Sequence, residues 1–281
     1  MTFEFWRLRF HFHAEESVAF SAGKAANVLR GAFGMMLRET ASPTAYARIF
    51  APVAAGEGPS GLADRPRPFV FRAAHLDGKT FSAGSSFHFD MHLFDVKHPA
   101  MPALQNAYAR LAETGLGPGR GRATLVSVGK DHFAIPMDGP PERAACIRVQ
   151  FVTPTELKGA LRPEFPVLFA RLRDRISTLR ALYGPGPLDI DFRAMGERAA
   201  AVRLTRCDLT WHSTERRSSR TGQTHPLGGF TGQAEYHAQY DGDLAEFLPY
   251  LRAGQWTGVG RQTVWGKGEI CFQPCSLQKR S

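Results

Sequence analysis

Apolar residues recur along this chain in two patterns, one typical of strands and one typical of helices. Alternating runs over residues 3–12 and 147–152 predict half-buried strands, because successive side chains of a strand point to opposite faces. Apolar residues spaced three and four apart over residues 24–40 and 165–183 predict amphipathic helices. The chain therefore divides into two halves, each of which opens with a strand and continues with a helix.

Each half also ends in the same way, with a glycine-rich loop that leads into a further strand. In the first half the loop covers residues 115–122 and the strand residues 123–128; in the second half the corresponding ranges are 258–268 and 269–272. Residues 136–143, with three prolines and one glycine, are interpreted as the linker between the halves.

Repeated strand–helix–strand units of this kind predict an α+β protein. We expect two tandem ferredoxin-like (RRM-like) domains with antiparallel sheets, an N-terminal domain over residues 1–140 and a C-terminal domain over residues 141–281. The similarity between the halves is one of layout rather than of sequence.

The predicted helix over residues 24–40 has one apolar face and one basic face. The apolar face comprises Ala25, Val28, Leu29, Ala32, Phe33, Met36 and Leu37. With about 100° between successive residues, Asn27, Arg30, Gly34 and Arg38 gather on the opposite face. Glycine inside a helix costs about 1 kcal/mol relative to alanine, so this face either meets another backbone closely or is a solvated basic surface.

Residues 87–94 alternate as a strand does, with apolar and polar side chains on opposite faces. The polar face carries His88, Asp90 and His92, and His11 and His13 alternate similarly on the first strand. Two histidines beside a carboxylate could hold a metal ion, but a half-buried strand more often presents such a face to water. We therefore predict no metal site.

The most informative segment is residues 258–268, in which two Gly-x-Gly pairs flank a basic stretch. Its glycines and cations are Gly258, Gly260, Arg261, Gly266, Lys267 and Gly268. Glycine lets another backbone approach closely, and bared amides with cations beside them suit phosphate groups. The segment is predicted to bind a chain of phosphates, and the alternative is a tight glycine hairpin.

A second basic segment covers residues 212–225, between two strand-like runs. It contains Arg216, Arg217 and Arg220 among serine and threonine residues and resembles a long hairpin tip. Arginine mixed with hydroxyl groups is suited to contacting a phosphate backbone. The alternative is a mobile surface loop.

The amino-acid composition indicates what kind of partner the protein binds. The chain of 281 residues has a formal net charge of +9, and only seven of its 35 basic residues are lysines. Arginine binds phosphate bidentately and stacks on bases, so a polyanion is the first partner to consider, although a genome rich in G and C also enriches arginine. There is no run of about 18 apolar residues and no signal-peptide pattern, so we expect no membrane span and a cytoplasmic protein.

The four cysteines are Cys146, Cys207, Cys271 and Cys275. None forms a C-x-x-C pair, and no paired metal-ligand spacing is present. For a cytosolic protein we interpret them as free, mostly buried thiols.

Four blocks in chain order give the sequence a family resemblance. They are Leu29–Gly34, Tyr46–Phe50 with Pro68–Phe71, Gly228–Gly232, and Phe247–Leu251 leading into the glycine segment. Together they resemble the CRISPR-associated endoribonucleases of the RAMP superfamily that cut precursor crRNA. The match is strongest near residues 24–95 and 225–270, and the C-terminal glycine motif is shared across RAMP proteins.

The resemblance implies two tandem ferredoxin-like domains that bind CRISPR repeat RNA, often as a stem-loop. It also implies metal-independent cleavage at the base of the stem, without a cofactor. The ribose 2′-hydroxyl would attack the adjacent phosphate and leave a 2′,3′-cyclic phosphate and a 5′-hydroxyl. Other CRISPR effector subunits are the implied protein partners.

The sequence departs from the family pattern in its first helix. Many relatives place a general-base histidine in or just after this helix, whereas Met35 and Met36 stand where it would be sought. His13 could serve instead, as could Tyr46 with Lys24 or Arg48.

The remaining possibility is electrostatic catalysis by Arg30 and Arg38. Arginine is a poor base but can hold a phosphate and stabilise its developing charge. We favour this arginine hypothesis, which would fit a divergent, type IV-like member.

The candidate residues fall into two sets. The catalytic candidates are Arg30, Arg38, His13 and Tyr46, and the RNA-binding candidates are Lys24, Asn27, Arg216, Arg217, Arg220, Gly258, Gly260, Arg261, Gly266, Lys267 and Gly268. Two other functions stay open: a non-catalytic RNA-binding RAMP subunit of a CRISPR effector complex, and a metalloenzyme using His88, Asp90 and His92.

Overall fold

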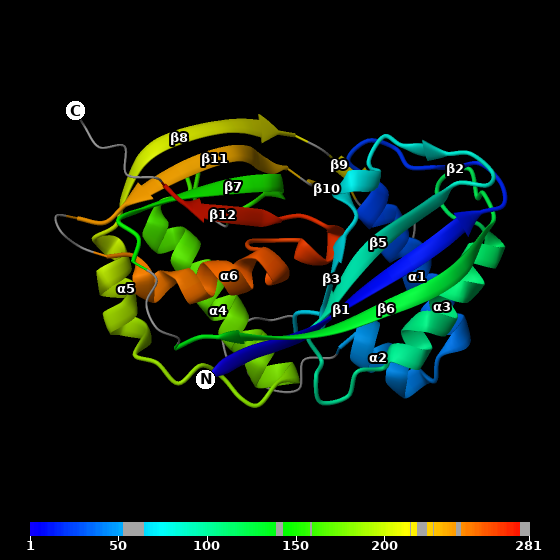
Figure 1. The fold of residues 1–281 in the computed structure, drawn as a ribbon, viewed down its shortest axis with the longest axis horizontal. Coiled ribbons are helices and arrows are strands. Elements are labelled where there is room, and N and C mark those ends of the chain that lie inside the picture. The colour runs from blue at the N-terminus through cyan, green and yellow to red at the C-terminus, as the bar shows by residue number, and fades with distance from the viewer. Residues whose placement is uncertain are drawn as a thin grey trace.

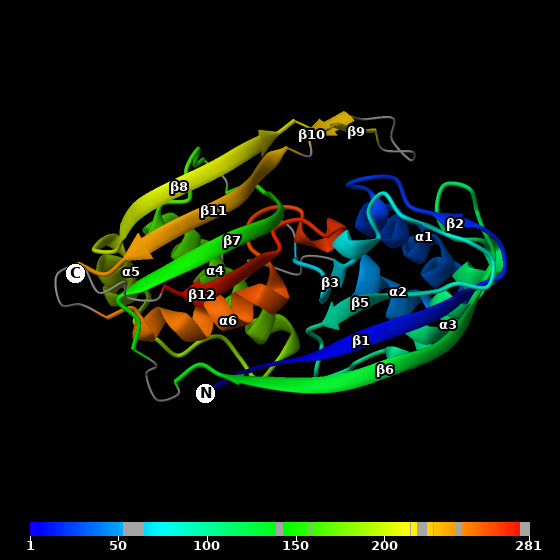
Figure 2. The ribbon, with the colours of Figure 1, turned by 45° about the horizontal axis from the view of Figure 1, so that its top comes forward.

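The computed structural model contains two lobes, each built on a four-stranded antiparallel sheet with helices on one face (Figures 1 and 2). The structure describes residues 1–52, 65–138, 143–157, 159–213, 215–217, 224–226, 228–239 and 243–275. Within these ranges, no helix is both long and apolar enough to cross a membrane.

The N-terminal sheet has the strand order β3-β5-β1-β6, with every neighbouring pair antiparallel. Its strands are β1 (Thr2–Ala14), β3 (Phe69–Arg72), β5 (Ser86–Leu93) and β6 (Ala123–Pro136), and its helices are α1 (Ala25–Thr40), α2 (Pro43–Phe50) and α3 (Met101–Thr114). The short strands β2 (Val18–Ala19) and β4 (Thr80–Phe81) pair separately, and the 3₁₀ helix η1 (Ala74–Leu76) follows β3.

The C-terminal sheet repeats this order as β12-β7-β11-β8. Its strands are β7 (Cys146–Thr155), β8 (Arg203–His212), β11 (Gly229–His237) and β12 (Ile270–Pro274), and its helices are α4 (Phe165–Tyr183), α5 (Phe192–Ala200) and α6 (Leu248–Thr257). The remaining elements are the paired strands β9 (Glu215–Arg217) and β10 (Thr224–Pro226) and the 3₁₀ helices η2 (Ala245–Phe247) and η3 (Thr263–Trp265).

Both lobes follow the β–α–β–β–α–β plan, with the first and third strands in the centre of the sheet. The predicted α+β class with two ferredoxin-like units and antiparallel sheets is confirmed. The proposed boundary at residues 140 and 141 lies outside the described residues, between the end of β6 at Pro136 and the start of β7 at Cys146.

The first strand joins the two lobes because its two ends are buried on opposite faces. Phe10 and Phe12 face α1 and α3, whereas Phe3 and Phe5 belong to the hydrophobic core of the C-terminal lobe. The ring centroid of Phe5 lies 4.9 Å from that of Trp256 in α6. Burying a phenylalanine side chain contributes about 1.5–3 kcal/mol, so these contacts hold the lobes together.

Several predicted elements extend further than the hydrophobic pattern indicated. β6 continues to Pro136, the first residue of the predicted linker, because it pairs with β1 along its whole length. β11 begins at Gly229, inside the glycine-containing block at residues 228–232, and its pairing with β7 has a register shift between Phe230 and Gly232. A Cβ on Gly232 would collide with the carbonyl oxygen of Asp208 on β8.

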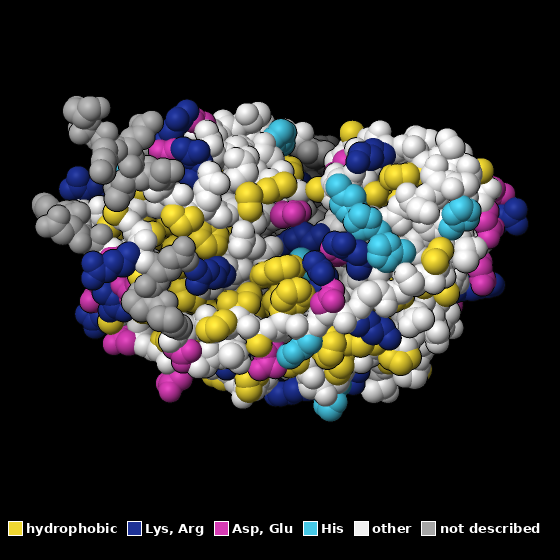
Figure 3. Space-filling model, viewed as in Figure 1, with side chains coloured by type: hydrophobic (Ala, Val, Ile, Leu, Met, Phe, Trp, Pro, Cys, Tyr) yellow, Lys and Arg dark blue, Asp and Glu magenta, His cyan; other side chains and the backbone are white. Residues whose placement is uncertain are grey.

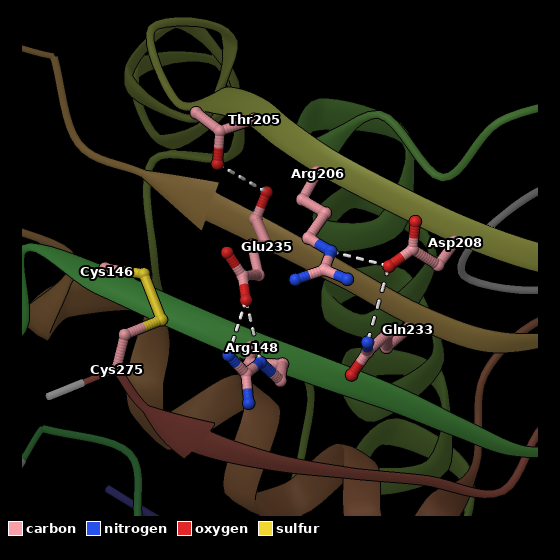
Figure 4. Close-up of polar contacts among 8 residues, drawn as sticks. All are labelled: Cys146, Arg148, Thr205, Arg206, Asp208, Gln233, Glu235 and Cys275. Atoms are coloured by element: carbon pink, nitrogen blue, oxygen red, sulfur yellow. Dashed lines mark hydrogen bonds and ion pairs between the residues drawn. A yellow bond between two sulfur atoms is a disulfide. The ribbon is translucent and has the colours of Figure 1, made fainter.

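The prediction of four free thiols is wrong for two of them. Cys146 and Cys275 form a disulfide, which Figure 4 shows beside the polar pairs of the C-terminal sheet. β12 pairs with β7 in a register that brings the two Cα atoms within 5.2 Å of each other, a separation that a disulfide spans. Cys207 and Cys271 are free, and Cys271 is exposed rather than buried.

Candidate nucleic-acid interface between the two domains

A groove of about 740 Å³ lies where the two lobes meet. One wall comes from the start of α1 and from η1, the opposite wall from β7, β8 and β11, and the end from η3. The lining residues that the argument uses are Lys24, Asn27, Asp77, Thr153, His212, Thr231, Trp265, Gly266 and Lys267. Figure 3 shows lysine and arginine side chains gathered at this junction.

The groove continues across the front of the N-terminal sheet. A neighbouring hollow of about 540 Å³ shares Asp77 and Thr153 with the first groove. That hollow in turn shares Arg72, His75 and Glu269 with a third of about 390 Å³, which borders the open faces of β1 and β5. The three adjoining hollows therefore give an extended ligand a continuous path from η3 to the N-terminal sheet.

The glycine segment closes one end of the groove, and its glycines have two different roles. A Cβ on Gly268 would collide with the carbonyl oxygen of Val259, and the Val259 amide donates to the Gly268 carbonyl at 2.9 Å. Gly258 and Gly260 likewise lie against backbone atoms of the C-terminal lobe. Gly258 and Gly268 thus fold the segment on itself, as in a tight hairpin, whereas Gly260 packs against the carbonyl oxygen of Glu156.

Gly266 instead joins the glycine segment to the N-terminal lobe. It has a positive φ of 76°, and a Cβ there would collide with the side chain of Ala26 on α1. The next residue, Lys267, is half-buried and lines the groove. Burial lowers the pKa of Lys267, and nearby Glu156 opposes that shift. The segment thus delivers one cation to the groove.

The start of α1 forms the facing wall of the groove. Lys24 is the N-cap residue of this helix, and Asp77 Oδ1 accepts from the backbone amide of Ala25 at 2.8 Å. Burial raises the pKa of Asp77, while the amide hydrogen bonds oppose that shift. Asn27 Oδ1 is buried and has no hydrogen-bond partner among the residues that the structure describes. Lys24 and Asn27 therefore offer a cation and an acceptor to a ligand.

Arg30 lies one turn further along α1, between two aromatic rings. Its guanidinium carbon lies 4.6 Å from the ring centroid of Phe50 and 5.6 Å from that of Trp265. Such cation–π contacts contribute about 0.5–2 kcal/mol each. Trp265 lines the groove, so Arg30 adds positive charge directly behind the groove wall. Tyr46 stacks on Phe50 at 5.6 Å and supports this cluster.

The basic face of α1 is therefore not a solvated stripe along its length. Gly34 is buried beneath the Phe50 ring, which occupies the space that a Cβ would need. Close packing therefore explains Gly34, although its partner is a side chain of α2 rather than another backbone. The other glycine of this helix, Gly31, has open space where a Cβ would stand.

The other candidates lie away from the groove or cannot be placed. Arg38 and His13 are exposed, and neither is among the described residues that line it. Arg261 is exposed and forms an ion pair with Glu156 at 2.8 Å. Arg216 and Arg217 belong to β9, but their side chains lie outside the description, and Arg220 lies outside the described residues altogether.

The sequence interpretation missed one candidate, His212. This residue ends β8, lines the groove and has its Nε2 atom 2.7 Å from the hydroxyl oxygen of Thr231. The register places β8 beside the Gly228–Gly232 block of β11. Strand alternation puts His212 on the open face of the sheet, but only the pairing of β8 with β11 shows that this face meets α1 across the groove.

The open face of the C-terminal sheet contributes paired rather than free charges. Arg148 donates to Glu235 at 2.6 and 2.8 Å, and Arg206 donates to Asp208, which also accepts from Gln233 (Figure 4). The lysines that line the groove, Lys24 and Lys267, come from α1 and from the glycine segment rather than from this sheet face.

The histidines and carboxylate of β5 do not form a metal centre. Asp90 binds Arg9 through two hydrogen bonds, and His92 Nδ1 lies 2.9 Å from the carbonyl oxygen of Trp256. Throughout the described residues, no group of three or more His, Cys, Asp or Glu side chains could hold a metal ion.

The C-terminal end of α6, just before the glycine segment, is held by three side chains, two of them buried. Arg72 of β3 donates to the carbonyls of Gln255 and Trp256 at 3.0 and 3.1 Å, and Arg175 of α4 donates to Thr257. Cations at the C-terminal end of a helix interact favourably with the helix dipole, and they donate to carbonyl groups that have no partner within the helix. His92 adds a further contact from the N-terminal sheet.

Acid is expected to weaken this junction through His92. Burial lowers the pKa of His92 from 6.5 to about 3, so the folded protein binds fewer protons than the unfolded chain between these values. Stability is then lost as the pH falls below about 6.5, by about 2 kcal/mol between pH 7 and pH 5. Denaturant unfolding of the wild type and of His92→Asn measures this, because asparagine keeps a donor for Trp256 without titrating.

The difference in unfolding free energy between the wild type and the variant should shrink as the pH falls, because only the wild type loses stability through protonation of His92 in the unfolded chain. Parallel pH profiles for the wild type and His92→Asn would show that His92 does not set the acid sensitivity.

Two family models match the chain, one over each lobe. Residues 3–135 match a family described as an N-terminal domain, and residues 149–270 match the family described as CRISPR-associated endoribonuclease Cas6. A comparison with curated proteins gives no match.

Solved structures of Cas6 proteins share the fold over almost the whole chain. A product complex of Thermus thermophilus Cas6 has a TM-score of 0.60 at 17% identity, covering 97% of this chain and 100% of that one. A second Cas6 product complex has a TM-score of 0.58 at 18% identity, covering 96% and 99%. A Cas6-RT-Cas1–Cas2 complex has a TM-score of 0.58 at 13% identity, covering 99% of this chain and 47% of that one. At these identities the likeness shows the fold.

Residues 149–270 thus match the Cas6 endoribonuclease family, and the chain has the fold of solved Cas6 proteins, in agreement with the resemblance of its sequence motifs.

Proposed function

We propose that the chain binds CRISPR repeat RNA in the groove between its lobes and cuts it without a metal ion to give mature crRNA. The groove carries this proposal, because it places Lys24, Asn27 and Lys267 on facing surfaces of one elongated hollow. Solved relatives of the same fold are described as product and substrate-mimic complexes, which supports an RNA ligand. Such RNA is expected to fold as a stem-loop, with the cut at the base of its stem.

The chemistry requires only alignment and proton transfer. The ribose 2′-hydroxyl loses its proton, its oxygen attacks the adjacent phosphorus, and the bond from phosphorus to the 5′-oxygen breaks as that oxygen takes a proton. The products are a 2′,3′-cyclic phosphate and a 5′-hydroxyl. Lys24 and Lys267 hold the phosphate, and Arg30 stabilises its developing charge from behind Trp265.

His212 is the group that we propose for removing the 2′-hydroxyl proton. If Nε2–H donates to Thr231 Oγ1, the other ring nitrogen is free to accept a proton. This arrangement supplies the imidazole that α1 lacks. Tyr46, Arg38 and His13 remain alternatives, but only Tyr46 belongs to the cluster around Arg30.

Cleavage of labelled repeat RNA in EDTA tests the proposal. Wild type should cut at one site, and the Arg30→Ala, Arg38→Ala double variant should cut more slowly. Product ends that resist a 5′-phosphate-dependent exonuclease and carry a cyclic phosphate would support attack by the 2′-hydroxyl. If neither protein differs from buffer, the enzyme proposal fails.

The second candidate function is a non-catalytic RNA-binding subunit. The absence of a histidine from α1 favours it, because Met35 and Met36 stand where many relatives carry the base. Tight RNA binding without cleavage in the same assay would support this function. We also propose that the chain assembles with other CRISPR proteins, since the same fold occurs within a Cas6-RT-Cas1–Cas2 complex.

Within the glycine segment, Lys267 is expected to contribute more to RNA affinity than Arg261. Lys267 lines the groove, whereas Arg261 is exposed and is not among the described residues that line it. Lys267→Ala should weaken binding and lower the slope of log affinity against log salt by about 1, because one phosphate contact is lost. Arg261→Ala removes a cation six residues away and should change both the RNA affinity and the salt slope by less.

Salt titrations of RNA binding by fluorescence anisotropy give both slopes directly. Equal slopes for wild type and Lys267→Ala would remove the glycine segment from the RNA path.

A further inference from the structure

Three histidine rings form a row on the open face of the N-terminal sheet. The ring centroid of His88 on β5 lies 5.6 Å from that of His11 on β1 and 5.0 Å from that of His75 on η1. The interplanar angles are 34° and 31°, so each ring is tilted relative to its neighbour. Figure 3 shows histidine side chains gathered in such a row over this lobe.

The position of each ring is fixed by the fold. His11 and His88 are directly opposite each other in the antiparallel pairing of β1 and β5, so their side chains project from the same face. His75 Nε2 lies 2.8 Å from the backbone carbonyl oxygen of His88, which ties η1 to β5. The row is therefore a built feature rather than three independent surface residues.

The row borders the path that the interdomain groove provides. His75 and His88 line the third hollow, which connects through Arg72, His75 and Glu269 to the rest of the groove. His11 and His75 are exposed and His88 is half-buried, so a ligand lying in this hollow can reach the rings.

The charges around the row are already balanced within the sheet. Arg9 binds Asp90 at 2.7 and 2.8 Å, and Arg7 binds Asp131 at 2.8 Å. Burial lowers the pKa of His88, and Arg9, His75 and His11 lower it further, whereas Asp90 opposes the shift. The lowered pKa favours the neutral, aromatic imidazole of His88.

We propose that His11, His88 and His75 form a stacking platform for unpaired ribonucleotides that flank the part of the RNA held in the groove. β1 and β5 are the central strands of the sheet, and in RRM domains the aromatic residues of the sheet stack two or three bases. Stacking on such rings tolerates any base, because every base has a π face. The proposal rests on the proposed function in that the ligand is RNA, and it assigns single-stranded RNA to this face.

Binding of two labelled RNAs tests the platform, in EDTA and at neutral pH. The probes are a single-stranded 12-nucleotide RNA of alternating A and C and a 12-base-pair RNA duplex. The single strand should bind more tightly than the duplex. The His11→Ala, His88→Ala double variant should lose about tenfold or more in affinity for the single strand, which corresponds to ~1.4 kcal/mol or more. His98→Ala, an exposed histidine in the loop before α3, is the matched control.

Phenylalanine variants separate stacking from charge. His88→Phe keeps a ring and removes the ionisable nitrogens, so it should retain single-strand affinity within about threefold while His88→Ala does not. The salt slope should stay unchanged in both, unlike in Lys267→Ala. Equal losses for the phenylalanine and alanine variants, a lowered salt slope, no loss in either, or equal binding of duplex and single strand would each overturn the proposal.

The binding test of the histidine platform can be distinguished from the cleavage test of the proposed nuclease function. Cleavage of repeat RNA is measured at saturating protein, where weakened stacking does not limit the rate. Loss of single-strand affinity together with absent cleavage would uphold the platform and reject the nuclease, and the reverse pattern would do the opposite.

Discussion

His212→Ala is expected to slow RNA cleavage about 100-fold or more while RNA affinity changes little. Proton transfer by a positioned side chain contributes typically ~10²–10⁴ to a reaction rate. His212 lines the part of the groove that also contains Lys24 and Lys267, and its contact with Thr231 Oγ1 fixes the orientation of the ring. Single-turnover cleavage at saturating protein, in EDTA, measures the chemical step without interference from binding.

Two further variants sharpen this measurement. His212→Asn keeps a hydrogen-bonding group beside Thr231 but has no base, so it should be as slow as His212→Ala, and added imidazole should restore part of the rate to the alanine variant. His237→Ala, at the far end of β11 and exposed, controls for the loss of a surface histidine from the same sheet. A large loss in His13→Ala with none in His212→Ala would move the proton-transfer role to His13.

Arg72→Ala is expected to destabilise the protein by about 3 kcal/mol. The side chain is buried and donates to the carbonyls of Gln255 and Trp256, across the junction between β3 and α6. A hydrogen bond from a charged group contributes about 1.5–3 kcal/mol, and a buried carbonyl left without its donor adds a desolvation cost. Glu269, 4.0 Å from Arg72, would also lose its cationic neighbour. Chemical denaturation measures the change in unfolding free energy.

Arg110→Ala provides the matched comparison. Arg110 also pairs with a carboxylate, Glu113, but both side chains are more than 60% exposed, so its removal should cost about 0.5 kcal/mol or less. If the two arginine variants lose similar stability, Arg72 does not clamp the lobes, and the end of α6 must be held by Arg175 and His92 alone.

Regular elements could be predicted from the sequence where one face is apolar throughout. The helix over residues 165–183 was predicted with the bounds that the structure has, and α1 differs by one residue. β6 was predicted too short because most of its side chains are exposed and the hydrophobic alternation fades. The division of β1 between two cores was missed, since Phe3 and Phe5 look like a continuation of the same strand until the second lobe covers them.

The parts of the candidate site that could be predicted are those defined by residues close together in the sequence. The glycine segment and the start of α1 both reach the groove, and both were identified from residue types within a short window. His212 and the Cys146–Cys275 disulfide depend on strand register between distant segments, which no local pattern encodes. Two of the three histidines in the row, His11 and His88, were identified from the alternation of their strands. His75 lies in a different element, and only the fold brings it beside His88.

Crosslinking of repeat RNA carrying photoreactive uridines, followed by mass spectrometry of the linked peptides, tests the central claim most directly. The account predicts crosslinks on both walls of the groove, in the segments around residues 24–27, 150–154 and 265–267. Crosslinks confined to the helical faces outside the groove, with none in these three segments, would contradict it.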